Sequence, residues 1–340
     1  MESASSRMFR REALLAALVL ALPRRARADV PPDSVAQCLA GMAGASVAPA
    51  RDTAEWASYA RREDERWEHE GPRLRAMQEW SARELAPLLP RERPVIYPFA
   101  GPDALHALAL FGDSPRLLLI GLEPVGDLPD TATMVAPRYF ARLGDAMEDL
   151  HRLTFFRTHA LASDFDRAGV LPALLATVAR MGGLVTRAEL VTRGVRIDWQ
   201  AKGVVRRLDY RQADLANAGL ARDPQLVASM RALGPCVSFL KAASYLLAEP
   251  RFSFVRRMIL EDSDVVVQDD TGIPFHAFDA RWALRFFGRY EAPLSPFQDR
   301  LQPDLQREFA RRAPSPLPFG IGYHVEARSS NLLVASKVRG

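Results

Sequence analysis

The sequence contains few lysines and few cysteines. Of its 45 basic residues, only Lys202, Lys241 and Lys337 are lysines. The two cysteines, Cys38 and Cys236, can form at most one disulfide within the chain, which excludes a small fold held together by several such bonds. A single disulfide and two buried thiols remain open as alternatives.

The sequence also lacks an apolar run long enough to cross a membrane. The run Ala13–Leu22 has ten residues, whereas a transmembrane helix needs about 20. Three arginines precede this run, and the small-x-small sequence Ala26-Arg27-Ala28 follows it. This order is typical of a secretory signal. We therefore expect a signal peptide over residues 1–28, cleaved after Ala28, and a soluble mature protein that is periplasmic or secreted and has no transmembrane segment.

The route of export stays open. The pair Arg10-Arg11 fits a twin-arginine signal, which would mean export of an already folded protein. An ordinary secretory signal can carry two arginines as well. The alternative to any signal is a short N-terminal helix without a targeting role.

Neither sign of charge is in excess outside this segment. Residues 1–28 hold six arginines and two glutamates, which leaves 39 basic and 39 acidic residues in the rest of the chain. A basic surface patch is the usual footprint of a protein that binds nucleic acid or an anionic membrane. The balanced charge therefore predicts neither DNA nor RNA nor such a membrane as a partner, and it leaves the oligomeric state open.

The next part of the chain predicts helices. Residues 29–51 are rich in alanine, proline and glycine and are interpreted as an extension, and residues 52–90 are interpreted as a helical region. Apolar residues recur at helical spacing from Asp52 to Gly71-Pro72, which we expect to end the first helix. A second helix is predicted from about Arg73 to Leu89.

Residues 91–340 predict one α/β domain. The segment 94–99 has the length and content of a buried strand, Gly101-Pro102 starts a helix, and residues 117–122 form a second strand. A strand, a helix and a strand within about 30 residues favour a parallel βαβ unit. Further strands are predicted at residues 184–192 and 204–210, which could pair, and at 265–267, with helices at 139–156, 170–181 and 253–260.

The C-terminal sequence predicts an antiparallel hairpin. The segments 320–325 and 332–336 flank a polar stretch, which is the pattern of two strands and a loop. The predicted fold class is therefore α/β and Rossmann-like: a largely parallel sheet, a C-terminal antiparallel hairpin and an N-terminal helical region.

Gly101 after the first predicted strand and Glu123 after the second resemble the class I methyltransferase-type Rossmann fold. In that fold a glycine follows the first strand and an acid ends the second. The resemblance implies an enzyme that uses S-adenosylmethionine. The loop here has one glycine, between Pro98 and Pro102, where a typical member has two or three. Because S-adenosylmethionine and nicotinamide nucleotides are cytoplasmic, no cofactor is predicted for an exported protein.

Several phrases resemble those of a family of exported bacterial proteins whose activity is uncharacterised. The phrases are YPFAGPD, GLEPVG, KAASYLL, QDDTGIPF and FGIGY. The resemblance extends from about residue 50 to the end of the chain. It implies export and assigns no chemistry.

Charged residues follow predicted strands at their carboxyl ends. Ligands of open α/β sheets bind beyond these ends, so we expect an acidic cleft that binds a small polar ligand or a hard cation, or holds an acid/base pair. The candidate residues are Gly101, Asp103, Glu123, Lys241, Asp269 and Asp270. Each has a local alternative, because the helix dipole alone favours Asp103 in a first turn, Glu123 can fix a turn, and Asp269-Asp270-Thr271-Gly272 has turn chemistry throughout. Whether the protein is an enzyme stays open.

Ser238 and Lys241 have the Ser-x-x-Lys spacing of penicillin-recognising serine hydrolases. That chemistry requires both side chains on one face at a helix start, so that the lysine can accept the serine proton. A serine hydrolase is therefore a third alternative, although the sequence lacks the Lys-Thr-Gly partner motif. The six histidines have no standard ligand spacing, and no metal site is predicted.

Overall fold

The computed structural model describes residues 30–44, 47–89, 93–153, 169–290 and 299–338. The predicted signal peptide and its cleavage site lie outside these residues. Pro32–Gly340 forms one compact unit. Its α-helices are α2 (Pro32–Leu39), α3 (Ala48–Arg51), α4 (Ala54–Trp80), α5 (Ala104–Phe111), α6 (Thr131–Met134), α7 (Tyr139–Leu153), α9 (Leu171–Arg180), α10 (Asn217–Arg222), α11 (Pro224–Arg231), α12 (Ser253–Asp262) and α13 (Pro303–Arg311). Its strands are β1 (Val95–Tyr97), β2 (Arg116–Gly121), β3 (Leu184–Val191), β4 (Gly194–Ala201), β5 (Val204–Gln212), β6 (Cys236–Leu240), β7 (Ser263–Gln268), β8 (Trp282–Gly288) and β9 (Asn331–Lys337).

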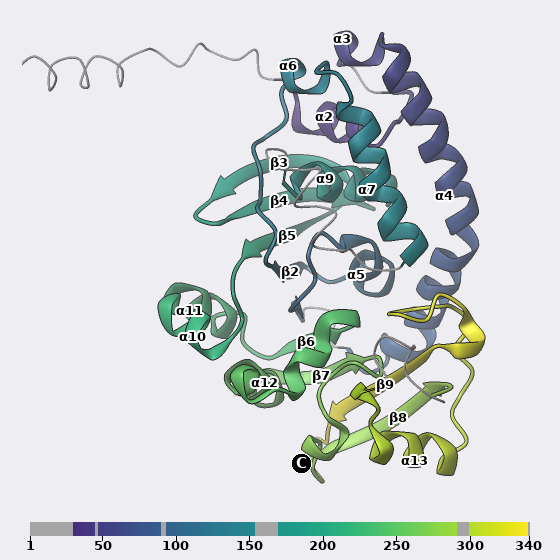
Figure 1. Ribbon diagram of the computed structural model, residues 1–340, viewed down its shortest axis with the longest axis vertical. Coiled ribbons are helices and arrows are strands. Elements are labelled where there is room, and N and C mark those ends of the chain that lie inside the picture. The colour runs from purple at the N-terminus through teal and green to yellow at the C-terminus, as the bar shows by residue number, and fades with distance from the viewer. Residues whose placement is uncertain (1–29, 45–46, 90–92, 154–168, 291–298, 339–340) are drawn as a thin grey trace, which may run out of the picture. The chain divides into compact units, whose positions relative to one another are not determined.

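The described strands form one mixed sheet in the order β3-β4-β5-β2-β1-β6-β7-β9-β8 (Figure 1). The five central strands β5, β2, β1, β6 and β7 are parallel. The outer pairs are antiparallel, with β3 and β4 beyond β5 and with β9 and β8 beyond β7. This confirms an α/β fold whose sheet is largely parallel in the core, with antiparallel strands at the C-terminal end.

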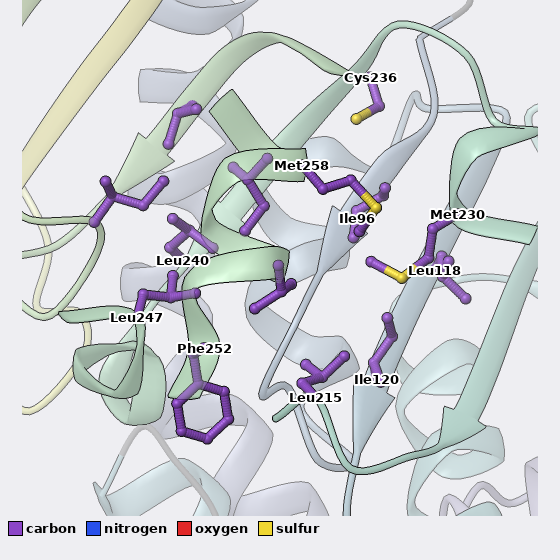
Figure 2. Packing of buried hydrophobic residues seen from close by; sticks show 14 of the residues in the cluster. Ile96, Leu118, Ile120, Leu215, Met230, Cys236, Leu240, Leu247, Phe252 and Met258 are labelled. Atoms are coloured by element: carbon purple, nitrogen blue, oxygen red, sulfur yellow. The ribbon is translucent and has the colours of Figure 1, made fainter. Parts of the chain in front are cut away.

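Alternate residues of the central strands are buried on opposite faces of the sheet. On one face Ile96, Leu118 and Leu240 pack with residues of α11 and α12 in a single apolar cluster (Figure 2). On the other face the ring centroids of Tyr97 and Phe239 are 4.7 Å apart. Helices α5 and α9 lie on this second face, and α2, α4 and α7 pack against them. Burial on both faces explains the continuous apolar runs of these strands.

Helix α4 runs unbroken through Gly71-Pro72, so the prediction of two helices separated at this point is wrong. A proline inside a helix removes one backbone hydrogen bond and costs about 3 kcal/mol. Packing on both sides of the proline opposes this cost. Trp56 is buried before it, and Trp80 is buried after it, where its ring meets Phe287 edge-on at 5.0 Å.

The predicted C-terminal hairpin is also wrong in its pairing. Strand β9 pairs with β7 and β8, whereas residues 320–325 form a tight turn with a single bridge between Ile321 and His324. The first five residues of β9 are all buried, as expected for an interior strand. The segments 184–192 and 204–210 are strands as predicted, but the unpredicted β4 lies between them.

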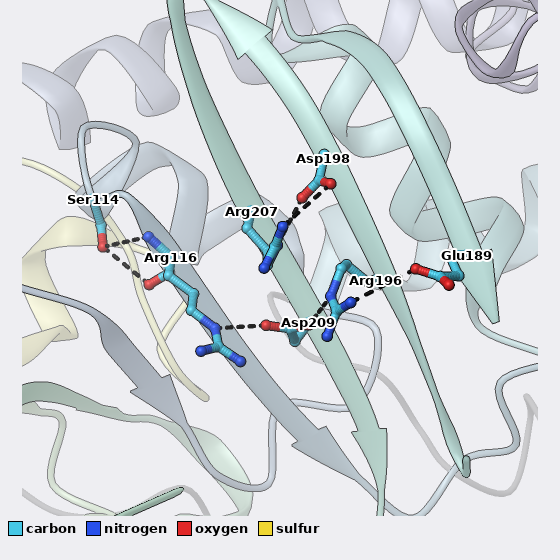
Figure 3. A network of polar contacts seen from close by, with 7 residues as sticks. All are labelled: Ser114, Arg116, Glu189, Arg196, Asp198, Arg207 and Asp209. Atoms are coloured by element: carbon cyan, nitrogen blue, oxygen red, sulfur yellow. Dashed lines mark hydrogen bonds and ion pairs between the residues drawn. The ribbon is translucent and has the colours of Figure 1, made fainter. Parts of the chain in front are cut away.

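An ion-pair ladder crosses the antiparallel extension β3-β4-β5 and joins it to β2 (Figure 3). Nε of Arg116 on β2 lies 2.6 Å from Asp209 of β5, which also receives Nε of Arg196 from β4 at 3.4 Å. Arg207 of β5 lies 2.7 Å from Asp198 of β4. Cross-strand pairs of opposite charge stabilise a sheet by a few tenths of a kcal/mol to about 1 kcal/mol each.

Three further observations bear on the expectations from sequence. Both cysteines are buried and free in the structure. No helix within the described part of the chain is long and apolar enough to cross a membrane. The predicted helix at 139–156 is present as α7 up to Leu153, and the residues that follow lie outside the described ranges.

Candidate functional site

The strand order reverses between β1 and β6. Strands β2 and β5 follow β1 on one side, and β7 follows β6 on the other. The loop after β1 contains two residues in the left-handed region, Phe99 (φ 60°) and Gly101 (φ 53°). It leads to Asp103, which accepts a hydrogen bond from the backbone N–H of His106 and so caps α5. Asp103 therefore lies at the carboxyl end of β1, at the point of reversal.

Asp103 is the centre of a buried polar network from three elements, here called the Asp103 network. Its Oδ2 accepts a hydrogen bond from the Tyr97 hydroxyl at 2.8 Å and lies 2.6 Å from Nζ of Lys241, which follows β6. Its Oδ1 lies 2.8 Å from Nδ1 of His106, and Nζ of Lys241 is 3.1 Å from the same Nδ1. All four residues are at most 2% exposed.

The network contains an ion pair and a neutral imidazole. Burial by itself would raise the pKa of Asp103, but His106 and Lys241 hold it well below its ordinary value. Burial lowers the pKa of His106 to about 4, so its ring is uncharged at pH 7. Burial also lowers the pKa of Lys241, while Asp103 acts in the opposite direction. A paired carboxylate and ammonium can be held in a dry interior at this separation.

The segment after β7 is hydrogen-bonded to the segment after β6. The backbone N–H of Ala242, a residue with φ 57°, donates to Oδ2 of Asp269 at 3.0 Å. The backbone N–H and hydroxyl of Thr271 donate to Oδ1 of Asp269 at 2.9 and 2.5 Å. Burial, together with the neighbouring Asp270, raises the pKa of Asp269 to about 6. Asp269 and Lys241 thus belong to one cluster.

Asp270 has one buried carboxylate oxygen without a donor. Its Oδ2 lies 3.6 Å from Nε2 of His324, in the turn that replaces the predicted hairpin, and this interaction raises the pKa of His324. Its Oδ1 receives no hydrogen bond from the residues that the structure describes, although the side chain is only 4% exposed. Such an atom costs about 1–3 kcal/mol or more if it stays unsatisfied. A hydrogen-bond donor at Oδ1 of Asp270 would therefore stabilise this site.

Gly101 and Glu123 lie against each other. A Cβ on Gly101 would be 3.3 Å from Oε2 of Glu123, which is 7% exposed as a residue. The Tyr210 hydroxyl donates to the backbone carbonyl of Glu123 at 2.8 Å. The six candidate residues are all buried, and their contacts link them in two sets. In one set Lys241 contacts Asp103, and its neighbour Ala242 contacts Asp269, which precedes Asp270; the other set is Gly101 and Glu123.

Sequence reasoning missed three participants in the site. Tyr97 was assigned only to a strand, His106 only to a helix, and His324 to a hairpin. The Asp103–His106 spacing of three residues was a usable signal, because a helix N-cap residue faces the third residue after it. His324 had no local signal, since it meets Asp270 through tertiary structure alone.

The serine hydrolase geometry is not formed. Ser238 lies inside strand β6, where its hydroxyl is 2.8 Å from that of Ser263. Lys241 is three residues further on, and side chains three apart in extended chain point to opposite faces of the sheet. Its Nζ contacts Asp103 instead. The Ser-x-x-Lys spacing therefore has no catalytic meaning in this fold.

Comparisons with known proteins assign no family to this site. No protein-family model matches the chain, and no curated protein matches its sequence. Within the residues that the structure describes, no group of three or more His, Cys, Asp or Glu side chains is placed to hold a metal ion.

The carboxyl group of Asp269 is expected to titrate near pH 6, and Asp270→Asn is expected to lower that midpoint. The variant removes the neighbouring negative charge that raises the pKa of Asp269. A folded-state pKa above the unfolded value of about 4 means that the stability from this group is complete below pH 4. It is then lost as the pH rises through about 6.

The measurement is a carboxyl ¹³C titration of Asp269 by nuclear magnetic resonance. Asp264→Asn is the matched control, because Asp264 lies on β7, the strand that precedes Asp269, and pairs with Arg93 at 2.8 Å. It should leave the midpoint unchanged. A titration midpoint of Asp269 near pH 4 in the wild type would contradict the coupling of the two aspartates. So would a midpoint that is the same in the wild type and in Asp270→Asn.

Proposed function

We propose that this protein binds a small molecule rich in hydroxyl or amino groups at the carboxyl ends of β1, β6 and β7. The observation that carries the proposal is Oδ1 of Asp270, which is buried and receives no hydrogen bond within the described part of the chain. A hydroxyl or ammonium group of a ligand would supply the missing donor. The acidic site expected from the sequence fits this role.

The charges near Asp270 favour a neutral or cationic ligand over an anion. Asp103 and Lys241 are paired with each other, so their charges largely cancel. Asp269 and Asp270 are adjacent, and Asp270 pairs with His324. A phosphate or carboxylate at this position would be repelled by the aspartates, whereas hydroxyl and ammonium donors would be attracted.

We infer further that the sheet is doubly wound in the Rossmann manner. The parallel strands β1, β2, β5, β6 and β7, numbered one to five in chain order, have the spatial order 3-2-1-4-5, as in the first five strands of that fold. Ligands of such sheets bind at the point where the strand order reverses, which here lies between β1 and β6. Asp103 and Lys241 lie at that point.

A methyltransferase-fold enzyme is the second candidate. The observation that favours it is Glu123, which follows β2 and lies against Gly101, as the resemblance to the class I methyltransferase-type fold implies. S-adenosylmethionine carries ribose hydroxyls and a sulfonium cation, both of which suit an acidic site. Its cytoplasmic location opposes this candidate if the protein is exported.

Export itself is part of the proposal. Cell fractionation followed by N-terminal sequencing of the native protein tests it. A periplasmic or secreted chain that begins at Asp29 supports cleavage after Ala28. An intact N-terminus in the cytoplasm would overturn export and make the methyltransferase candidate the better one.

Ligand binding is tested by thermal unfolding with D-glucose, spermidine, adenosine and S-adenosylhomocysteine as probes. At least one of these is expected to raise the unfolding temperature, because a ligand that binds the folded state stabilises it. Asp270→Asn should weaken that binding at least tenfold, and the control Asp264→Asn should not. Binding of S-adenosylhomocysteine alone, lost in Glu123→Gln, would favour the enzyme. No response to any probe, or an equal response in Asp270→Asn, would contradict the proposal.

A further inference from the structure

The side of α4 that faces α5 and α7 is polar in its middle section. Its polar residues recur at helical spacing of three or four: Glu63, Arg66, Trp67, Glu70 and Arg73. Glu63 and Glu70 are 1% and 8% exposed. Arg66 pairs with Glu63, and Nε of Arg73 lies 2.7 Å from Oε2 of Glu70. These two ion pairs leave the buried section without net charge.

This section of α4 contacts α7 directly (Figure 1). Nη2 of Arg66 donates to the backbone carbonyl of Gly144 at 3.2 Å. The ring of Trp67 meets the ring of His151 at the end of α7, with 5.1 Å between centroids and 74° between planes. Helix α5, which carries His106, also packs against α4. We call the layer between these three helices the α4 seam.

Polar atoms without a hydrogen-bond partner gather in the α4 seam. His151 is 4% exposed, and neither of its ring nitrogens has a hydrogen-bond partner among the described residues. His106 is fully buried and its Nε2 has none. The same holds for Nε1 of Trp67 and Nη2 of Arg73. Each unsatisfied buried group costs about 1–3 kcal/mol, and native proteins satisfy nearly all of them with protein, water or ligand.

Apart from the Glu70–Arg73 ion pair, the seam has more N–H groups than lone pairs without a partner among the described residues. Trp67 and Arg73 offer N–H groups only, and a neutral His151 offers one N–H and one lone pair. In the tautomer whose Nδ1–H donates to the Asp103 carboxylate, Nε2 of His106 provides a lone pair. Burial lowers the pKa of His151 well below its ordinary value, and Arg66 and Arg73 lower it further. Arg66 and Arg73 are thus the cationic side chains that act on the His151 ring.

We propose that the α4 seam is a second ligand site, which binds a small oxyanion through Trp67 Nε1, Arg73 Nη2 and His151. A carboxylate or a phosphate oxygen would accept the N–H groups that now lack partners. The His106 ring contacts Asp103 through Nδ1 and not through Nε2, and the proposed site prefers the opposite charge to the acidic site at Asp270. It therefore does not depend on the proposed function.

The test uses the indole ¹H–¹⁵N signals of the full chain labelled with ¹⁵N-tryptophan. Trp67→Phe assigns the Trp67 signal, because phenylalanine retains an apolar ring and lacks the N–H group. Sodium acetate and sodium phosphate are titrated separately against sodium chloride at equal ionic strength. The Trp67 signal is expected to move in a saturable way with one of the two oxyanions and not with chloride, and that outcome identifies a carboxylate or a phosphate.

His151→Gln should weaken this binding at least tenfold. The matched control is His69→Gln, because His69 lies exposed on α4 and should bind as the wild type does. If His151→Gln does not fold, the rise in unfolding temperature that the oxyanion causes is compared between the wild type and Trp67→Phe. The proposal requires this rise to be smaller in Trp67→Phe. No saturable response to either oxyanion, or one that both substitutions leave unchanged, would overturn the site.

Discussion

Lys241→Met is expected to lower the free energy of unfolding by about 3–5 kcal/mol. The substitution keeps an unbranched side chain of similar length but removes the ammonium group 2.6 Å from Oδ2 of Asp103. Asp103 is 1% exposed and would be left as a buried carboxylate supported by Tyr97 and His106. Removal of one partner from a buried ion pair costs about this much, because the other charge stays uncompensated.

Urea unfolding of the wild type and variants measures this effect. Lys202→Met is the matched control, because Lys202 is exposed in the turn between β4 and β5, and its loss should change stability by less than about 0.5 kcal/mol. The double variant Asp103→Asn/Lys241→Met should recover part of the loss, since it removes both charges together. A loss of less than about 1 kcal/mol in Lys241→Met, or no recovery in the double variant, would show that the pair is not a buried, mutually dependent unit.

The edge of the sheet that carries the Asp103 network was predictable from sequence, but the network itself was not. Fully apolar runs such as Val95–Tyr97 mark interior parallel strands, and residues that follow such strands meet at one edge. That reasoning placed Asp103, Glu123, Asp269 and Asp270 at one edge, whereas Lys241 was a candidate without a predicted strand before it. It could not show that Asp103 and Lys241 form an ion pair, because side-chain direction depends on loop geometry, including the left-handed Phe99 and Gly101.

The wrong predictions share a physical cause: tertiary contacts stabilise a structure that the local sequence does not favour. Pro72 opposes a helix locally, but buried aromatic residues such as Trp80 hold α4 at both ends. Strand β9 pairs with β8 rather than with the adjacent 320–325 segment. Strand β8 was not predicted, because Arg285 interrupts its apolar residues. As a consequence, His324 lies in a turn beside Asp270 and not in the predicted strand.

Gly322→Ala is expected to lower the free energy of unfolding by about 3 kcal/mol or more. Gly322 has φ 67°, and a Cβ there would overlap Oδ2 of Asp269. That oxygen accepts the backbone N–H of Ala242, so it cannot move away without breaking the link between the β6 and β7 segments. The expected loss therefore combines backbone strain of about 1–2 kcal/mol with damage to a buried hydrogen-bond network.

Gly203→Ala separates these two contributions. Gly203 has φ 77° in the tight turn between β4 and β5, and nothing lies within 4 Å of a Cβ placed there. This control should lose only the strain, about 1–2 kcal/mol. The excess loss in Gly322→Ala, measured by urea unfolding, then reports the close fit of the Gly322 turn against Asp269. Equal losses in the two variants would mean that the turn can move away from Asp269 without cost. The Gly322–His324 turn would then be a loose cover over the acidic site rather than a fixed wall of it.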